Sequence, residues 1–520
     1  MNGDVRPWAA GPVPVPTGAQ AVAFDADAVA GGIPSSVLME RAGAQAAELV
    51  VRLHGRTRDR PVLVVAGMGN NGADALVTAR TLASWGVPVH VLRPRAGDRG
   101  LDRLHGWDVA VHRADNMGDE ALHALFSTAS SVVDGLLGTG LTEAPRPEIQ
   151  RIIDGFVHAG GPILALDLPS GVVADDGRVP VRAVQADATL AFGFPKMGTL
   201  LHPGRASVGR LIVAEIGFPP LNLKKSGWFE ALTPHWAGSR RPRRRPATHK
   251  NQVGALTIVA GGDQMAGAAL LAARAGLRAG AGYVRVISAP SNRDAILAAL
   301  PDAVFVDRTD ASAVREALEA AAAIVAGPAM GTGAEAAGLL KAVLAAGRPT
   351  VLDADALTLL AASPVDLTAL ADTTILTPHP GEAGRLLGVQ TADVEANRPG
   401  ALDRLTERYG VGVILKGTPT LVAVEGRRYI DTLGSSDLAV AGMGDTLAGA
   451  VGSFLAQGLQ PAAAAGVGLV TTARAAALAN RGAGLQATDV PAHLPDALAE
   501  GWGDTDLDLP WITLDLDSAR

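Results

Sequence analysis

Unbroken apolar runs alternate with segments of helical periodicity along the first half of the chain. The runs predict strands at residues 61–66, 87–92, 131–137 and 163–168, with later strands near Ala188 and Leu211. Runs of this length are typical of strands buried on both faces, as in parallel sheets. Helical segments between them complete a β/α alternation. The first half is therefore predicted to be a Rossmann-like, doubly wound α/β sheet.

A helix is predicted ahead of the first strand, at residues 36–53, with Ser35 or Ser36 as its N-cap. Its apolar face would comprise Val37, Leu38, Ala42 and Ala46. A second helix, extending to about Ser84, follows the glycine-rich loop after the first strand. Strand, glycine loop and helix in this order predict a ligand-binding turn.

The alternation restarts in the second half of the chain. Strands are predicted at residues 255–260, 284–288, 323–326, 350–353, 374–376 and 412–415, and an alanine-rich helix at 265–279. The second half is therefore also predicted to be α/β.

Length and composition indicate two domains and exclude several classes of protein. A chain of 520 residues exceeds one ordinary core. We predict a first domain at 1–230, an Arg/Pro linker at 231–246, a second domain at 247–497 and an acidic tail at 498–520. The linker arginines could instead bind phosphates, and the tail could form a short edge strand.

The chain has no cysteine, so disulfides and thiolate metal sites are excluded. A net charge of −7 argues against nucleic acid as the main partner. No secretory signal precedes the first helix, and the apolar stretch at 462–479, interrupted by Arg474, predicts a buried helix, not a membrane span. We therefore expect a cytoplasmic protein with no membrane partner, and a homo-oligomer.

Three polar clusters follow predicted strands of the first half. They are Asn70, Asn71 and Asp74; Asp134 with the loop 135–140; and Asp167 with Pro169, Ser170 and Gly171. Ligands gather at the carboxyl ends of strands in such sheets, so these clusters should converge. Oxygen atoms of Asn71, Asp134 and Ser170 would suit a hard cation. Turn formation is the alternative for each residue alone.

These motifs resemble the signature loops of NAD(P)H-hydrate epimerases, which interconvert the R and S forms of hydrated NADH and NADPH. The resemblance implies a potassium ion on Asn71, Asp134 and Ser170, and Asp167 as the acid or base. It implies substrate contacts from Asn70, Asn71, Gly72, Ala73, Asp74, Gly138, Thr139, Gly140, Leu141, Asp167 and Lys196. Ala73 and Ala75 replace the glycines usual in the family, and their methyl groups would weaken binding where backbone approaches phosphate.

The most chemically specific stretch of the second half is Gly442, Met443, Gly444 and Asp445, followed by a run of small residues that predicts a helix. Free backbone N–H groups at a helix N-terminus form an anion hole. An acid at its mouth suggests a base that takes a proton from a hydroxyl while the N–H groups hold a phosphoryl group. The alternative is an Asp that only caps the helix.

Other strand ends of the second half carry His379, Lys416, Asp353 and Asp355. Each has a structural alternative: a histidine held in a Pro-flanked turn, a lysine in a strand-end salt bridge, and acids that only terminate a strand. The two acids could also bind magnesium through water.

In their order these motifs resemble the ribokinase-like fold, and more narrowly the ADP- or ATP-dependent NAD(P)H-hydrate dehydratases. There the nucleotide phosphorylates the hydroxyl of the hydrate, and elimination of phosphate restores the nicotinamide. The resemblance implies Asp445 as the base, magnesium on the phosphates, and hydrate contacts from Gly267, Ala268, Ala269, Gly331, His379 and Asp445. It implies nucleotide contacts from Lys416, Gly417, Thr418, Pro419, Thr420, Gly442, Met443 and Gly444.

The two resemblances together predict a bifunctional isomerase and lyase that repairs NAD(P)H hydrates at the expense of ADP or ATP. The main alternative is a ribokinase-like kinase of a small molecule such as a vitamin precursor, with an appended Rossmann-like binding domain. A second alternative makes the first domain a non-enzymatic scaffold, because related domains occur in messenger-RNA decapping scaffolds. The presence of Asn71, Asp134, Asp167 and Ser170 argues against the scaffold.

Overall fold

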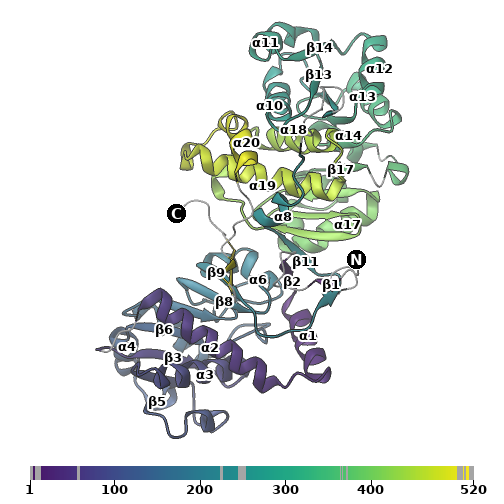
Figure 1. Ribbon diagram of the computed structural model, residues 1–520. Helices are drawn as coiled ribbons and strands as arrows, with labels where there is room; N and C mark the ends of the chain where they lie inside the picture. Colours follow the sequence, from purple (N-terminus) through teal and green to yellow (C-terminus); the bar gives the residue numbers. More distant parts are fainter. Residues whose placement is uncertain are drawn as a thin grey trace. The chain divides into compact units, whose positions relative to one another are not determined.

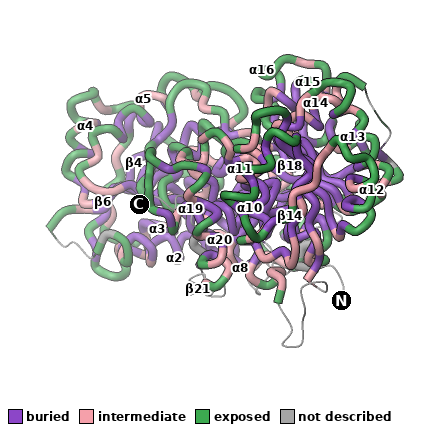
Figure 2. The backbone as a smooth tube through the Cα atoms, turned by 90° about the horizontal axis from the view of Figure 1, so that it is seen from above, coloured by how far each residue is buried: buried purple, intermediate pink, exposed green. Residues whose placement is uncertain are grey.

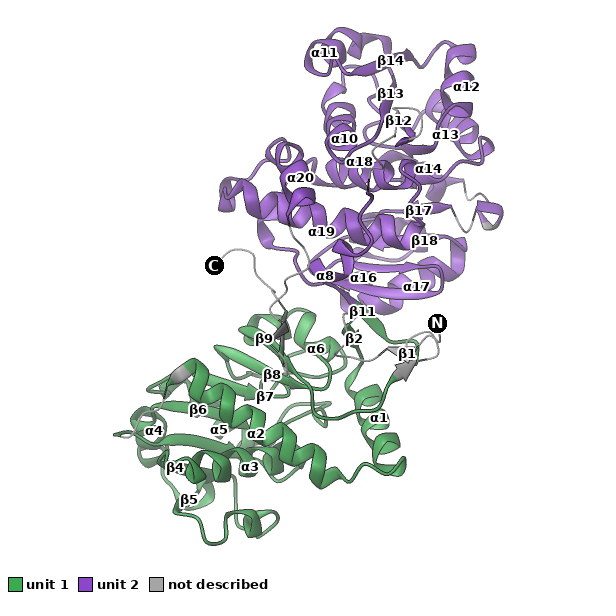
Figure 3. Cartoon of the chain, viewed as in Figure 1, with its two compact units in different colours: residues 1–230, 505–516 green, residues 231–504, 517–520 purple. Residues whose placement is uncertain are grey.

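The computed structural model describes residues 4–5, 13–55, 59–222, 226–243, 253–363, 365, 367–370, 373–500, 507–508 and 511–514. Both halves are layered α/β structures (Figure 1) whose central strands are buried (Figure 2). The chain divides into two compact units (Figure 3). Unit 1 comprises Met1–Glu230 and Thr505–Leu516, and unit 2 comprises Ala231–Asp504 and Asp517–Arg520.

Unit 1 contains a nine-stranded sheet in the order β21-β22-β9-β8-β7-β6-β3-β4-β5. The strands are β3 (Val62–Ala66), β4 (Val89–Arg93), β5 (Val109–Arg113), β6 (Ser131–Gly135), β7 (Ile163–Leu166), β8 (Ala188–Phe192), β9 (Arg210–Ala214), β21 (Leu507–Asp508) and β22 (Trp511–Leu514). Strands β3 to β9 are parallel, and β22 joins β9 antiparallel. The strand order reverses between β3 and β6, which is where ligands bind in such sheets.

Helices cover both faces of this sheet because its strands are apolar on both sides. Helices α2 (Ser35–His54) and α3 (Asn70–Ser84) share one apolar core with the sheet. Helices α4 (Asp119–Thr128) and α5 (Pro147–Gly155) share the other. The Rossmann-like, doubly wound prediction is confirmed.

Within unit 2 the strands follow the order β14-β13-β12-β15-β16-β17-β18-β19-β20. They are β12 (Ala255–Val259), β13 (Tyr283–Ser288), β14 (Ala303–Asp307), β15 (Ala323–Ala326), β16 (Thr350–Leu352), β17 (Thr374–Leu376), β18 (Gly412–Leu415), β19 (Leu421–Val424) and β20 (Arg427–Asp431). The first seven in this order are parallel, and β19 and β20 extend the sheet antiparallel. The order reverses between β12 and β15.

Two small-residue helices pack closely in unit 2. They are α10 (Ala266–Arg278) and α18 (Met443–Ala456). A Cβ added to Gly449 would lie 2.1 Å from the carbonyl oxygen of Ala272, so only glycine permits this approach. Helix α19 (Pro461–Ala479) is apolar and long enough to cross a membrane, but 67% of that apolar window is buried inside the structure. It is a core helix, as predicted.

The structure also differs from the sequence-based expectations at several elements. Helix α2 begins at Ser35 after Pro34, with no side-chain cap, and Val37 is 47% exposed instead of buried. The sequence did not predict α1 (Gly18–Ala30), β5, β14, β19 and β20, because the patterns of these segments are polar or alternating.

The predicted linker is partly structured. Helix α8 (Pro234–Gly238) is capped by Thr233, and Trp236 is buried in the core of unit 2. Arg244, Arg245 and Pro246 lie outside the described residues. In the acidic tail, β21 forms the short edge strand that the sequence allowed, and β22 pairs with it and with β9. Residues 501–506, 509–510 and 515–520 lie outside the described residues.

Candidate active sites

The first candidate site lies at the switch point of unit 1, where the loops after β3 and β6 meet. A Cβ on Gly67 would lie 1.9 Å from the carbonyl oxygen of Leu136, and one on Gly72 would lie 2.0 Å from that of Gly67. Glycine is thus required for the close backbone packing that places the N-terminus of α3 at the cavity. No side chain caps this N-terminus, and its first turn contains no acid. Its free N–H groups favour an anion.

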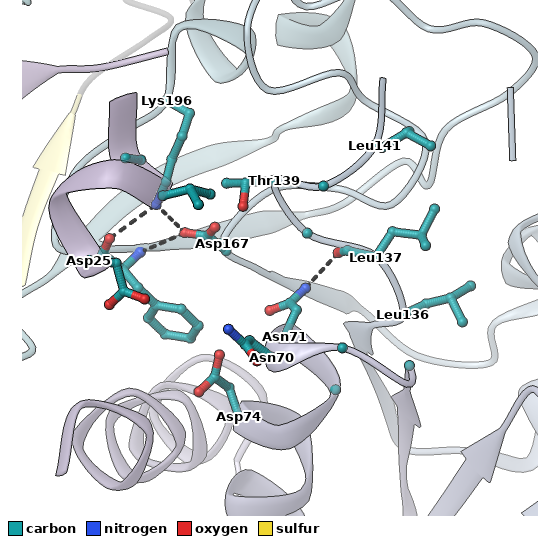
Figure 4. Close-up of a pocket in the computed structure, with 18 of the residues that line it drawn as sticks. Asp25, Asn70, Asn71, Asp74, Leu136, Leu137, Thr139, Leu141, Asp167 and Lys196 are labelled. Atoms are coloured by element: carbon teal, nitrogen blue, oxygen red, sulfur yellow. Dashed lines mark hydrogen bonds and ion pairs between the residues drawn. The ribbon is translucent and has the colours of Figure 1, made fainter. Parts of the chain in front are cut away.

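A cavity of about 700 Å³ opens beside this N-terminus (Figure 4). Its lining includes all but one of the residues expected to contact substrate in the first half: Asn70, Asn71, Gly72, Asp74, Gly138, Thr139, Gly140, Leu141, Asp167 and Lys196. Ala73 is absent from the lining, and so is Ala75, which is fully buried against Gly135. The methyl group of Ala75 therefore faces the core and not the cavity.

Lys196 and Asp167 form an ion pair at the wall of the cavity (Figure 4). The ammonium also donates to the carbonyl oxygen of Phe192 at 3.0 Å, and the backbone N–H of Phe192 donates to Asp167 Oδ1 at 3.2 Å. Asp167 has φ +68°, in the left-handed region that few non-glycine residues adopt. Such backbone strain is typical of functional positions.

Asn71, Asp134 and Ser170 converge beneath the cavity, as expected. The Asp134 carboxylate is fully buried and accepts hydrogen bonds from the Ser170 hydroxyl at 2.6 Å and the Ser170 N–H at 2.7 Å. The Asn71 amide donates to the carbonyl oxygens of Leu137 and Leu166, which leaves its own oxygen buried without a partner. Burial raises the pKa of Asp134 to about 6.

The buried, unpartnered amide oxygen of Asn71 and the buried carboxylate of Asp134 are a donor set that fits a hard cation such as potassium. No ion pair compensates Asp134 among the residues that the structure describes. These three side chains would hold the ion, because their remaining lone pairs are its natural ligands.

Two further carboxyl groups face the same cavity. Asp74 is buried, and desolvation together with the charges of Asp167 and Asp25 raises its pKa well above the ordinary value. Asp25, from α1, also lines the cavity. Burial raises the pKa of Asp25 too, against the opposing effect of Lys196. Asp25 escaped the sequence analysis because α1 lacks a clear apolar period.

The second candidate site lies at the start of α18. Gly442 is its N-cap, with φ +87°, and Asp445 lies in the first turn. Burial raises the pKa of Asp445 to about 6, with a further rise caused by Asp353 and an opposing effect of Lys416. A carboxylate with this pKa is suited to act as a base near neutral pH.

Lys416 is held by acids on two neighbouring strand ends. Its ammonium lies 2.7 Å from Asp353 Oδ1 and 3.9 Å from Glu382 Oε2. Burial alone would lower the pKa of Lys416, but the charges of Asp353 and Glu382 outweigh it and raise that pKa. A Cβ on Gly444 would lie 3.1 Å from Nζ, so the lysine contacts the α18 N-terminus directly. The strand-end salt bridge allowed by the sequence is therefore present.

His379 is the N-cap of α15 (Pro380–Leu387). Its Nδ1 accepts the N–H of Gly381 at 3.0 Å and that of Glu382 at 3.4 Å, and Glu382 Oε2 accepts the N–H of His379 at 2.8 Å. This reciprocal capping box leaves Nε2 to carry the proton of a neutral ring. Half of the His379 side chain is exposed, and its Nε2 lies 3.6 Å from Glu382 Oε1.

The remaining residues predicted to contact ligands at the second site differ in their exposure and in their hydrogen bonds. Gly267 and Ala268 are accessible at the start of α10, whereas the side chain of Ala269 is buried. Gly331, at φ +90°, donates its N–H to Asp355 Oδ2 at 2.8 Å. Met443 packs its side chain in the core, so only its backbone can face a ligand.

The loop 416–420 begins at Lys416, at the end of β18. Arg398, largely buried, donates to the carbonyl oxygen of Lys416 at 3.1 Å and packs against Gly417, which has φ +145°. Thr420 donates its hydroxyl to the carbonyl oxygen of Gly417 at 3.0 Å. Thr418 and Pro419 lie between these two anchors. A cluster of three or more His, Cys, Asp or Glu arranged to hold a metal is absent from the described part of the chain.

Comparison with known proteins gives matches over both units. Residues 35–198 match the family described as YjeF-related protein N-terminus, and residues 256–498 match the family described as NAD(P)H-hydrate dehydratase. The chain is 34% identical over 490 residues to a bifunctional NAD(P)H-hydrate repair enzyme of Thermofilum pendens, covering 90% of this chain and 92% of that one. The corresponding enzyme of Escherichia coli is 36% identical over 428 residues, or 80% of each chain.

Among solved structures, a dehydratase from Bacillus subtilis matches 51% of this chain and 96% of its own, with 26% identity and a TM-score of 0.45. That protein is an ADP/ATP-dependent NAD(P)H-hydrate dehydratase co-crystallised with ATP and Mg²⁺.

Proposed function

The chain belongs to the family of bifunctional NAD(P)H-hydrate repair enzymes, and we propose from this premise how its two sites divide the work. Unit 1 interconverts the R and S hydrates, and unit 2 dehydrates the S form. In domain terms, 1–230 carries the epimerase and 247–497 the dehydratase. Together the two activities return either hydrate to the reduced nicotinamide nucleotide.

In the dehydratase, Asp445 removes the proton from the C6 hydroxyl as its oxygen attacks the terminal phosphorus of ADP or ATP. The bond from that phosphorus to the leaving oxygen breaks, and the nucleotide departs one phosphate shorter. Phosphate then leaves with the C6–O electron pair while a proton is lost from C5, which restores the ring double bond. The N–H groups of Gly442 to Gly444 stabilise the moving phosphoryl group. Lys416, Gly417, Thr418, Pro419 and Thr420 bind the nucleotide, and Gly267, Ala268, Ala269, Gly331 and His379 the hydrate.

Magnesium, in this proposal, neutralises charge on the nucleotide phosphates. We assign it to phosphate oxygens because Asp353 and Asp355 are already hydrogen-bonded to Lys416 and to the N–H of Gly331. In the epimerase, Asp167 acts as the acid or base, and its carboxylate forms an ion pair with Lys196. Potassium held by Asn71, Asp134 and Ser170 would fix the loops after β6 and β7. We further propose that the protein is located in the cytoplasm and forms a homo-oligomer.

The observation that carries the dehydratase assignment is the position of Asp445. A carboxyl group with a pKa of about 6 stands in the first turn of a helix whose N-terminal N–H groups donate no hydrogen bond to a capping side chain. A cap residue would accept those hydrogen bonds itself, and here no side chain does so. The geometry therefore favours a base facing an anion.

The experiment is to incubate a mixture of R and S NADH hydrates with the protein, magnesium, potassium and either ADP or ATP. Near-ultraviolet absorbance of the reduced nicotinamide reports dehydration directly. Rapid recovery of the whole mixture supports both activities and identifies the nucleotide. Rapid recovery of the S portion alone would overturn the epimerase assignment. No recovery with either nucleotide would overturn both and favour a small-molecule kinase. The same assay with NADPH hydrates gives the preference between the two cofactors.

A further inference from the structure

Helix α1 places a carboxyl group in the cavity of unit 1 from outside the segment that matches a known family. That match begins at residue 35, and α1 spans Gly18–Ala30. Ala21, Val22 and Asp25 of this helix line the cavity. Ala21 and Asp25 are one helical turn apart and so lie on one face. Figure 4 shows Asp25 facing the same part of the cavity as Asp74, Asp167 and Lys196.

The position of α1 is fixed by contacts with the segment that carries Lys196. The N–H of Met197 donates to the carbonyl oxygen of Pro16 at 2.8 Å, one residue before the Thr17 cap of α1. Phe24 packs edge to face against Phe194 and Trp228, with ring centroids 5.5 Å apart in both pairs. Asp25 follows Phe24 directly, so this packing sets where its carboxyl group lies.

The Asp25 carboxyl group has no structural task of its own. It stands in the middle of a helix and caps nothing, and no hydrogen bond or ion pair engages it within the described segments. It is half-buried, which is costly for an unpaired charge. The chain keeps an unsatisfied acid at this point of the cavity, and such placement is typical of a group that exchanges protons with a ligand.

We propose that Asp25 is the second acid–base residue of the epimerase, working with Asp167. This inference rests on the proposed epimerase function. Inversion at C6 of the hydrate requires loss of the hydroxyl from one face of the carbon and addition of water to the other, each with a proton transfer at oxygen. The two carboxyl groups reach the cavity from different elements, α1 and the loop after β7.

C6 carries the hydroxyl group and is bonded to ring N1, whose lone pair forms a second N1–C6 bond as the C6–O bond breaks. Asp25 gives its proton to the departing oxygen, which leaves as water. Water then adds to the other face of C6, the second N1–C6 pair returns to N1, and Asp167 takes the proton that the added water loses. The reverse direction exchanges the two roles.

The charges near the two carboxyl groups favour Asp25 as the proton donor and Asp167 as the acceptor. Lys196 forms an ion pair with Asp167, so a positive charge stands beside the carboxylate that accepts the proton. Asp25 has no such partner, and burial raises its pKa, which favours the protonated form. Asp74 and Asp167 are the other carboxyl groups that face it, and Lys196 is the cation.

The test compares Asp25→Asn, Asp25→Glu and Asp27→Asn in the full-length enzyme. Asp27 is an exposed acid on the same helix and serves as the matched control. We expect Asp25→Asn to lower kcat for R-to-S conversion about 100-fold or more with KM changed less than about threefold. Asp25→Glu should recover part of the rate, and Asp27→Asn should match the wild type.

Dehydration of pure S hydrate by the same polypeptide is the internal control for folding and for the proposed function. It should be unchanged in all three variants. Retention of the wild-type conversion rate in Asp25→Asn would overturn the proposal, as would a rise in KM with kcat intact, because either result removes Asp25 from the chemical step.

If the Asp25→Asn variant does not fold, the Asp25→Glu variant still tests the proposal. A pH profile of kcat identical to the wild type in that variant would contradict acid–base participation, and a displaced one would support it. A wild-type enzyme without R-to-S conversion would instead contradict the epimerase assignment itself.

Discussion

Lys416 donates a hydrogen bond from Nζ to Asp353 Oδ1 at 2.7 Å, and this pair lies beneath the glycine turn that precedes Asp445. The pair acts on Asp445 in two opposite ways. The charge of Asp353 raises the pKa of Asp445, and that of Lys416 lowers it. Burial is the main cause of the raised pKa of Asp445, about 6, and Lys416, which is already paired with Asp353, offsets only part of the rise.

Replacing Asp353 by Asn should therefore lower the pKa of Asp445. The substitution removes a like charge and frees Lys416 to interact with the base, and both effects act in the same direction. We expect the acidic limb of the pH profile of dehydration to move down by at least about half a pH unit. Asp403→Asn, which alters an exposed acid paired with Arg428, is the control. An unmoved or upward-shifted limb would show that Asp353 does not set the pKa of the base.

Asp445→Asn should reduce the dehydration activity and increase the stability of the protein. Loss of the base is expected to reduce dehydration about 100-fold or more, with R-to-S conversion unaffected. The native pKa of about 6 exceeds the ordinary 3.8, so the native state binds the proton more tightly than the unfolded state does. The resulting stability is present below pH 4 and is lost as pH rises through 6.

The Asp445→Asn variant has no carboxyl group at this position, so it does not lose this stability as the pH rises. It should unfold at a higher temperature than the wild type at pH 8, by a free energy of at most about 3 kcal/mol, and the gain should vanish towards pH 4. Thermal unfolding at both pH values measures it. A variant less stable than the wild type at pH 8 would contradict the raised pKa of Asp445 in the native state.

The sequence predicted both sheets because their strands are nearly continuous apolar runs, and it predicted the loops because glycines and strand-end acids are local signals. It did not predict β5, a strand at the sheet edge in which Val109 is partly exposed and Ala110 and Val111 are exposed. It also could not reveal Asp25. That residue has no motif of its own, and only the packing of Phe24 against aromatic residues far along the chain brings it to the cavity.

His379 illustrates a related gap between sequence and structure. The Pro-Gly-Glu that follows it indicates a helix start, yet a histidine is not among the usual N-cap residues. Its capping role depends on Glu382 returning a hydrogen bond to its backbone, which is a reciprocal geometry visible only in the folded chain.

Asp167→Asn should stop consumption of the R hydrate while dehydration of the S hydrate continues. It should also destabilise unit 1 by about 3–5 kcal/mol, because Lys196 is 4% exposed and would lose its only ion-pair partner among the described residues. The double variant Asp167→Asn with Lys196→Met removes both charges. It should regain most of the stability without regaining activity, as measured by thermal unfolding and by R-to-S conversion. Recovery of activity in the double variant would exclude Asp167 from the chemistry.

Potassium should stabilise unit 1 through Asn71, Asp134 and Ser170. The unpartnered oxygen of Asn71 and the buried, uncompensated charge of Asp134 both gain from a bound cation, whereas the unfolded chain offers no such site. At a potassium concentration about 100 times the dissociation constant, the gain should approach about 2.7 kcal/mol, seen as a higher unfolding temperature in potassium chloride than in choline chloride at equal ionic strength. Asp134→Asn should abolish this difference, and the exposed-site variant Asp154→Asn should keep it. An equal potassium effect in Asp134→Asn would place the ion elsewhere, because the proposed site would have lost its only negative charge.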